Sequence, residues 1–77
     1  MSDDQRRKLV MMANQIARAF ESQADDPAAA AAAHIRAFWA RPMRERIVEH
    51  LQGGGDGLSA EAKAAVARLV PAHQPGA

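Results

Sequence analysis

The feature that most constrains this chain is Pro42, which lies inside an otherwise helical pattern. The surrounding stretch, residues 34–47, also holds the only tryptophan and one of the two phenylalanines of the 77-residue chain. Proline supplies no backbone N–H and disfavours helical geometry in the residue before it. We therefore predict a corner at Ala40–Pro42, with one helix ending before it and the next helix starting at Pro42. The large side chains of this stretch either fill the chain's own core or dock on another molecule.

Helical patterns cover most of the chain on both sides of this corner. Ser2 and Gln5 have the spacing of a capping box at the start of the first apolar stripe. Asp26 and Pro27 are typical of an N-cap and a first helical position, and the six alanines that follow favour a helix. Ser59 is a second predicted N-cap. The predicted helices cover about residues 3–23, 27–39, 42–51 and 59–70.

The second predicted helix supplies most of the bulky apolar side chains. On a helical wheel Ile35, Phe38 and Trp39 share one side. We expect Ile35 and Phe38 to lie inside the bundle and Trp39 to lie at its edge. Trp39 is therefore predicted to have a mixed role, partly core and partly interface.

The glycine-rich run 53–57 predicts a turn after the third helix, with Gly53 as a left-handed C-cap. No predicted strand precedes the run and no Lys-Ser/Thr follows it, so it does not have the pattern of a phosphate-binding loop. The predicted fold class is all-α, a small bundle of three to four helices. Residues 1–70 are expected to form a single helical domain, and residues 71–77 a flexible C-terminal tail.

The residues that carry chemistry in enzymes are poorly represented here. Cysteine is absent, and the three histidines have no metal-binding helical spacing to one another or to an acid. Ser59 already has a capping role, and Glu45 and Glu49 have arginines beside them. We predict no catalytic, cofactor-binding or metal-binding residue, and we expect that the chain itself is not an enzyme.

The charge balance limits the classes of partner. The formal net charge is +1, with acids and bases interspersed, which is not the basic imbalance of a dedicated nucleic-acid binder. No apolar run approaches the roughly 20 residues of a membrane span, and no signal-peptide pattern is visible. We expect a cytoplasmic protein with no nucleic-acid or membrane partner. A core of this size rarely supplies more than roughly 3–5 kcal/mol, so we expect a partner protein.

The candidate interface residues come from two helices and the corner. Arginines cluster in the sequence around the tryptophan, and these two residue types are common interface hot spots. For any one of these arginines, a solvated basic face is the open alternative. Met11 and Asn14 lie on the polar side of the first helix, where they indicate a second partner-facing surface. The predicted partner-interface residues are Met11, Asn14, Arg36, Trp39, Arg41, Met43 and Arg44.

Three blocks of the sequence resemble the small delta subunit of cytoplasmic NAD-dependent, molybdenum-containing formate dehydrogenases. The blocks are Lys8-Leu-Val-Met-Met-Ala-Asn-Gln-Ile16, then His34 to Ile47 with Phe38-Trp39 and Met43-Arg44, then Gly53-Gly54 with Gly57-Leu58. The resemblance covers about residues 6–70. Where the family's usual run has proline followed by arginine, this chain has Arg41 followed by Pro42.

The resemblance implies a non-catalytic accessory subunit of an enzyme that oxidises formate to carbon dioxide and reduces NAD. It implies that the large catalytic subunit carries the molybdenum cofactor and iron–sulfur clusters, that electron-transfer subunits carry FMN and further clusters, and that this chain carries no cofactor. Docking on and stabilising the catalytic subunit is the favoured role. A transient assembly or cofactor-maturation chaperone for that subunit is the alternative. A small helix-turn-helix nucleic-acid binder is a third and less favoured interpretation.

Overall fold

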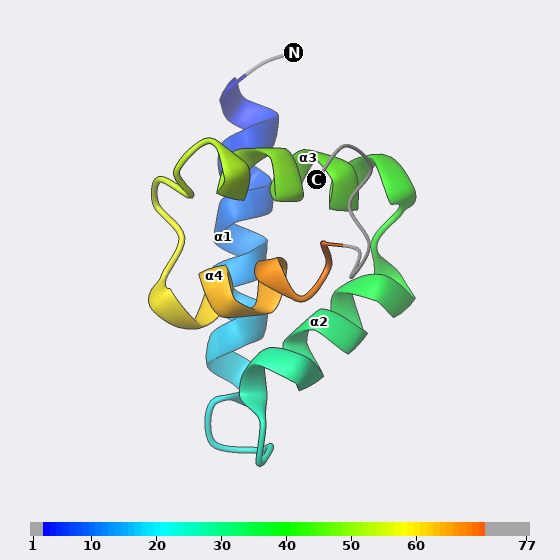
Figure 1. The fold of residues 1–77 in the computed structure, drawn as a ribbon, viewed down its shortest axis with the longest axis vertical. Coiled ribbons are helices and arrows are strands. Elements are labelled where there is room, and N and C mark those ends of the chain that lie inside the picture. The colour runs from blue at the N-terminus through cyan, green and yellow to red at the C-terminus, as the bar shows by residue number, and fades with distance from the viewer. Residues whose placement is uncertain (1–2, 71–77) are drawn as a thin grey trace.

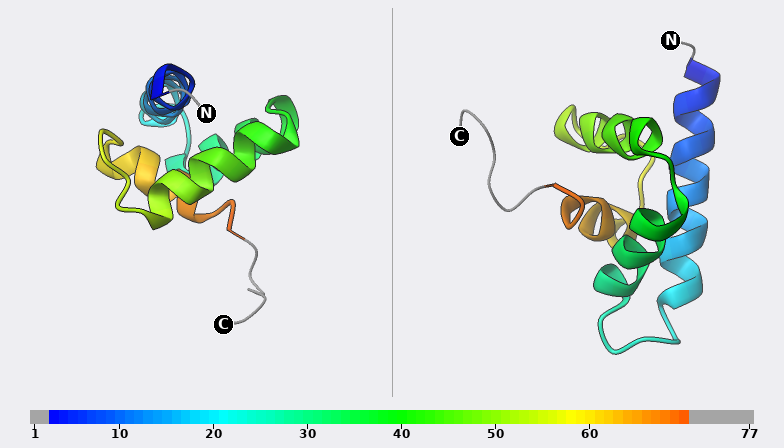
Figure 2. Two further views of the ribbon diagram at one scale, coloured as in Figure 1. Left: turned by 90° about the horizontal axis from the view of Figure 1, so that it is seen from above. Right: turned by 90° about the vertical axis from the view of Figure 1, so that its right-hand side faces the viewer.

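The computed structural model describes residues 3–70, which form four α-helices around a shared core and contain no strand in that range (Figure 1). The helices are α1 (Asp3–Phe20), α2 (Pro27–Phe38), α3 (Arg41–Gln52) and α4 (Ala60–Ala67). Helix α1 lies along one side of the molecule and contacts the other three helices (Figure 2). Helix α4 packs against both α2 and α3, whereas α2 and α3 barely touch each other. The prediction of an all-α bundle is confirmed.

Local side-chain chemistry sets where α2 and α4 begin. The Asp26 carboxylate accepts a hydrogen bond from the backbone N–H of Ala29 at 3.2 Å. The Ser59 hydroxyl oxygen accepts one from the backbone N–H of Ala62 at 3.1 Å. Each bond satisfies an N–H that the first turn of a helix leaves unpaired. Both predicted N-caps, and Pro27 in the first turn of α2, are confirmed.

Two helices end earlier than the sequence predicted. Helix α1 ends at Phe20 rather than near Gln23, and α4 covers residues 60–67 of the predicted 59–70. The predicted capping residue Ser2 and the predicted tail 71–77 lie outside the described residues. None of the described helices is long and apolar enough to cross a membrane.

The predicted corner exists, but it lies one residue earlier in the chain. Trp39 and Ala40 have extended backbones, with ψ of 139° and 152°. Helix α3 then begins at Arg41, so the predicted start at Pro42 is wrong by one residue. Proline is tolerated in a first helical turn because its missing N–H has no intrahelical acceptor there. The backbone N–H of Arg44 donates to the Ala40 carbonyl at 3.1 Å and closes that turn.

The glycine run forms the expected turn with a different set of left-handed residues. Gly53 has φ −84°, so its predicted role as a left-handed C-cap is wrong. Positive φ values occur instead at Gly54, Gly55 and Gly57. The backbone N–H of Gly55 donates to the His50 carbonyl at 2.9 Å, which satisfies an unpaired carbonyl at the end of α3.

The core is small and rich in alanine. The expected burial of Ile35 is confirmed, but Phe38 and Trp39 have exchanged the places that the sequence suggested. Trp39 is only 6% exposed, whereas Phe38 is 75% exposed. Trp39 lies four residues after Ile35 on the inner face, while Phe38 lies on the flank of α2. The buried hydrophobic residues are Leu9, Ala13, Ala17, Ala31, Ala32, Ile35, Trp39, Ile47, Leu58, Ala62, Ala65 and Val66.

Candidate partner interface

Two of the predicted interface residues make contacts within the chain. Trp39 belongs to the core cluster that joins all four helices. The Asn14 side chain is half-buried and ties α1 to the loop before α4. Its Nδ2 donates to the carbonyl of Gly57 at 3.0 Å, and its Oδ1 accepts from the backbone N–H of Ser59 at 2.9 Å. The Asn14 amide therefore uses both of its ends to hold the fold together.

Met11 lies on the outer side of α1 and is 60% exposed. It borders a shallow hollow of about 490 Å³ between α1 and the loop that follows α3. We call this the α1 hollow; it is lined by Arg6, Arg7, Val10, Met11, Asn14, His50, Asp56 and Gly57. On its far side the ring Nε2 of His50 lies 2.6 Å from the carbonyl oxygen of Asp56. The hollow thus combines an exposed methionine with the two arginines of its rim.

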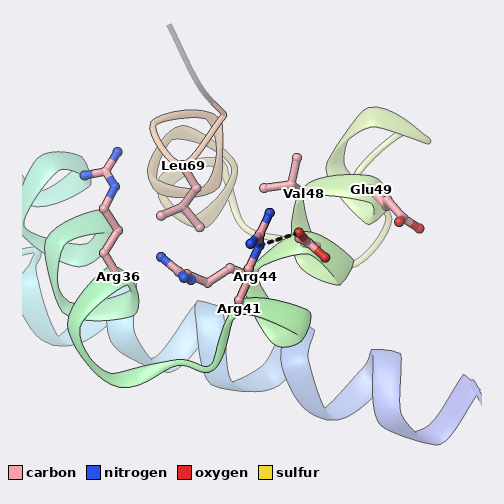
Figure 3. A pocket seen from close by; sticks show the side chains of 7 residues that line it. Arg36, Arg41, Arg44, Val48, Glu49 and Leu69 are labelled. Carbon is pink, nitrogen blue, oxygen red and sulfur yellow. Dashed lines mark hydrogen bonds and ion pairs between the residues drawn. The ribbon is translucent and has the colours of Figure 1, made fainter. Parts of the chain in front are cut away.

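Three other predicted interface residues come together in one pocket on a different part of the surface. We call it the arginine pocket; it has a volume of about 460 Å³ and is lined by Arg36, Arg41, Arg44, Glu45, Val48, Glu49 and Leu69. It opens between the end of α2, the first turns of α3 and the segment after α4. In Figure 3 the Arg44 side chain extends from α3 toward α2, where Arg36 stands, and Leu69 lies between the two helices. Met43, the last predicted residue, is half-buried and packs against the core instead.

The three arginines of the pocket differ in how their charge is used. Arg41 Nε donates to Glu45 Oε2 at 3.0 Å, in an ion pair whose side chains are 81% and 60% exposed. Arg36 donates from Nη2 to the backbone carbonyl of Arg68, at the end of α4. Arg44 Nε is buried and has no hydrogen-bond partner within residues 3–70. Arg44 is therefore the arginine of this pocket with an unused buried donor.

Sequence reasoning missed a row of aromatic rings, in which Phe20 at the end of α1 and His34 of α2 are half-buried and Phe38 is exposed. The rings of His34 and Phe38 have centroids 4.6 Å apart, and those of Phe20 and His34 are 5.9 Å apart. The spacing of four residues between His34 and Phe38 carries the signal, because such residues are neighbours on one side of a helix. The sequence prediction did not use this spacing, because it placed Phe38 inside the bundle.

Metal-binding groups do not gather in the described part of the chain. Across residues 3–70, no three histidine, aspartate or glutamate side chains lie where they could share a metal ion. The arrangement of this region offers surfaces for another molecule: an exposed methionine, an aromatic row that ends in the exposed Phe38, and a pocket of arginines.

Comparison with known proteins gives these surfaces a context. Residues 8–66 match the model of the family described as "NADH-dependant formate dehydrogenase delta subunit FdsD". Comparison with curated proteins and with solved structures found no match. The family match runs from the first turns of α1 to the last turn of α4 and includes all three blocks on which the resemblance rested. The chain therefore belongs to the FdsD family of formate dehydrogenase delta subunits.

Proposed function

We propose that this chain is a non-catalytic accessory subunit of an NAD-dependent formate dehydrogenase, and that it docks on and stabilises the molybdenum-containing catalytic subunit. The observation that carries the proposal is the family match over residues 8–66. In this proposal the partner subunits hold the molybdenum cofactor, the iron–sulfur clusters and FMN, and they convert formate to carbon dioxide with reduction of NAD. The chain works beside them in the cytoplasm.

Two features of the structure support a docking role. Six of the twelve buried hydrophobic residues in the described range are alanines, which bury little apolar area, and a chain of this size commonly gains stability from a partner. Phe38 and Met11 meanwhile leave large apolar side chains in solvent. Exposed aromatic and methionine side chains are enriched at protein interfaces relative to the rest of a surface.

Co-purification tests the proposal directly. The full chain, carrying an affinity tag, is co-expressed with the catalytic subunit and purified through size exclusion. We expect the tagged chain to retain the large subunit, with molybdenum and iron measurable in the same fraction. Elution of the tagged chain alone, as a monomer with a sharp thermal transition, would contradict the proposal.

Sizing of the mature enzyme separates a permanent subunit from an assembly chaperone. A permanent subunit is present in the active, cofactor-loaded complex in a fixed ratio to the catalytic subunit. A chaperone that acts only during maturation is found with the catalytic subunit before cofactor insertion and is missing afterwards. We expect the chain in the active fraction, quantified by mass spectrometry of the intact complex.

A further inference from the structure

We propose that the arginine pocket receives an acidic side chain of the catalytic subunit, an aspartate or glutamate that has an apolar residue beside it. This inference rests on the proposed function, because it assigns the docking role to one surface and states the chemistry of the segment that binds there. Its starting point is Arg44, whose Nε is buried at the pocket without a partner in residues 3–70.

The guanidinium of Arg44 has no ion-pair partner within residues 3–70, and this points to an anionic ligand that accepts hydrogen bonds. A buried N–H without an acceptor is unfavourable, and more so when the group is charged. A guanidinium presents its donors in a planar fork that matches the two oxygens of a carboxylate. A carboxylate placed in the pocket would pair with the guanidinium of Arg44, which lines the pocket and has no ion-pair partner within residues 3–70.

The neighbouring charges select a single carboxylate over a more highly charged anion. Three arginines and two glutamates line the pocket, so one positive charge is in excess. Glu45 is already paired with Arg41, and Arg36 spends one donor on the carbonyl of Arg68. One excess positive charge is balanced by one carboxylate. A phosphate dianion would carry more negative charge than the single excess positive charge of the pocket, and it would be repelled by Glu45 and Glu49.

The shape and the lining residues of the pocket indicate which residue type lies next to the partner's aspartate or glutamate. Val48 and Leu69 give the pocket an apolar side (Figure 3). Helices α2 and α3 barely touch each other, and the pocket is lined by both helices and by Leu69 of the segment after α4. Its volume of about 460 Å³ holds one or two side chains, whereas a whole helix is about 10–12 Å across. The occupant is therefore an acidic side chain with an apolar neighbour, presented by the partner's surface.

Replacing Arg44 by glutamine tests the proposal in the complex formed by the full chain and the catalytic subunit. We expect Arg44→Gln to weaken the affinity at least about tenfold, because loss of one member of an interfacial charge pair leaves the other unpaired. We also expect the affinity of the variant to depend less on salt concentration than that of the wild type. Arg44→Lys keeps the charge and loses the planar fork, so an intermediate affinity is expected.

Stability and a matched control separate docking from folding. Because Arg44 Nε has no partner within residues 3–70 to lose, the melting temperature of the Arg44→Gln chain should not fall below that of the wild type. Arg18→Gln makes the same change of charge at an exposed position of α1 outside the pocket. The affinity of the Arg18→Gln chain should stay within about twofold of the wild type, which is the scale expected for an exposed charge.

A photo-crosslinking residue at Val48, in the wall of the pocket, identifies what binds there. We expect the crosslinked peptide of the catalytic subunit to contain an aspartate or glutamate next to an apolar residue.

The docking proposal is overturned if Arg44→Gln binds the catalytic subunit with wild-type affinity and wild-type salt dependence. It is also overturned if that variant keeps the partner but loses binding of inorganic phosphate in calorimetry, which would make the pocket a small-anion site. Failure of the wild-type chain to retain the catalytic subunit would instead overturn the proposed function, and this inference with it.

Discussion

Phe38 and Trp39 are neighbours in the sequence whose side chains lie in opposite environments. Helix α2 ends at Phe38, and the extended backbone of Trp39 then leads into the corner. Trp39 lies on the same face of the chain as Ile35 and joins the core, whereas Phe38 lies beside His34 on the flank. The same residue pair therefore supplies the bundle with its largest buried side chain and the surface with its most exposed large apolar one.

A matched pair of variants tests this division. Trp39→Ala should lower the free energy of unfolding by about 3–5 kcal/mol, as expected when a large aromatic side chain is removed from a core. Since a core of this size supplies roughly that amount, the variant chain should be largely unfolded. Phe38→Ala should change the free energy of unfolding by no more than about 0.5 kcal/mol, because the side chain is mostly in solvent. Urea denaturation followed by circular dichroism measures both.

The emission of the tryptophan gives an independent check on the same assignment. A buried indole emits at shorter wavelength than one in water, so the emission of the isolated wild-type chain should already be blue-shifted. An emission that shifts only on addition of the catalytic subunit would contradict the core position of Trp39. Equal losses of stability in the two alanine variants would contradict it as well.

At the scale of elements, the sequence predicts best what depends on near neighbours. The caps Asp26 and Ser59 act on N–H groups three residues away, so their roles were visible in the sequence. The corner was visible because proline acts on adjacent residues, although its exact position depends on how α3 packs. By contrast, Asn14 bonds to Gly57 and Ser59, more than forty residues away, and no local pattern indicates that pairing.

The candidate site likewise has a part that the sequence predicts and a part that depends on tertiary packing. Arg36, Arg41 and Arg44 lie close in the sequence around the corner, so their association could be predicted from the sequence. Leu69 also lines the pocket, but it lies near the other end of the chain. Its place there could not be predicted, because only the tertiary packing of α4 brings Leu69 to the pocket. The unpaired state of Arg44 Nε is likewise a property of the packed structure.

The turn between α3 and α4 yields a prediction that separates its glycines. Gly55 has φ +67°, and an added Cβ would lie 3.2 Å from both Leu51 Cδ1 and Lys63 Cε. Gly55→Ala should therefore destabilise the chain by about 1–2 kcal/mol from backbone strain, with a further cost from crowding. Gly53→Ala is the control, since its φ is −84° and its new Cβ would make ordinary contacts of 3.5 Å or more.

The Gly53→Ala chain should be neutral or more stable by up to about 1 kcal/mol, because alanine restricts the unfolded chain without straining the native one. Thermal unfolding of the two variants beside the wild type measures the difference. If Gly53→Ala proved the more damaging substitution, the left-handed position would lie at Gly53, as the sequence pattern first indicated.

At the scale of the whole molecule, the α1 hollow and the arginine pocket are separate places where a partner could bind. The α1 hollow and the arginine pocket share no lining residue. No residue of α1 lines the arginine pocket, so a partner bound there meets α2, α3 and the segment after α4. Helix α1 contacts the other three helices, and these contacts fix the positions of the two regions relative to each other. Which region meets the catalytic subunit is thus a question that a residue-resolved measurement can answer.

Amide hydrogen exchange of the free chain and of the complex provides that measurement. A bound partner raises the free energy of local opening where it binds, so protection should increase most in the segment 36–49, which supplies six of the seven residues of the arginine pocket. Residues 4–15 of α1 should change less. The Arg44→Gln chain should be compared at the same occupancy by the partner. Its increase in amide protection should be smaller, and it should be confined to residues that contact the partner outside the pocket. An increase concentrated around Met11 would place the partner on the α1 hollow, and the arginine pocket would then be a solvated basic surface.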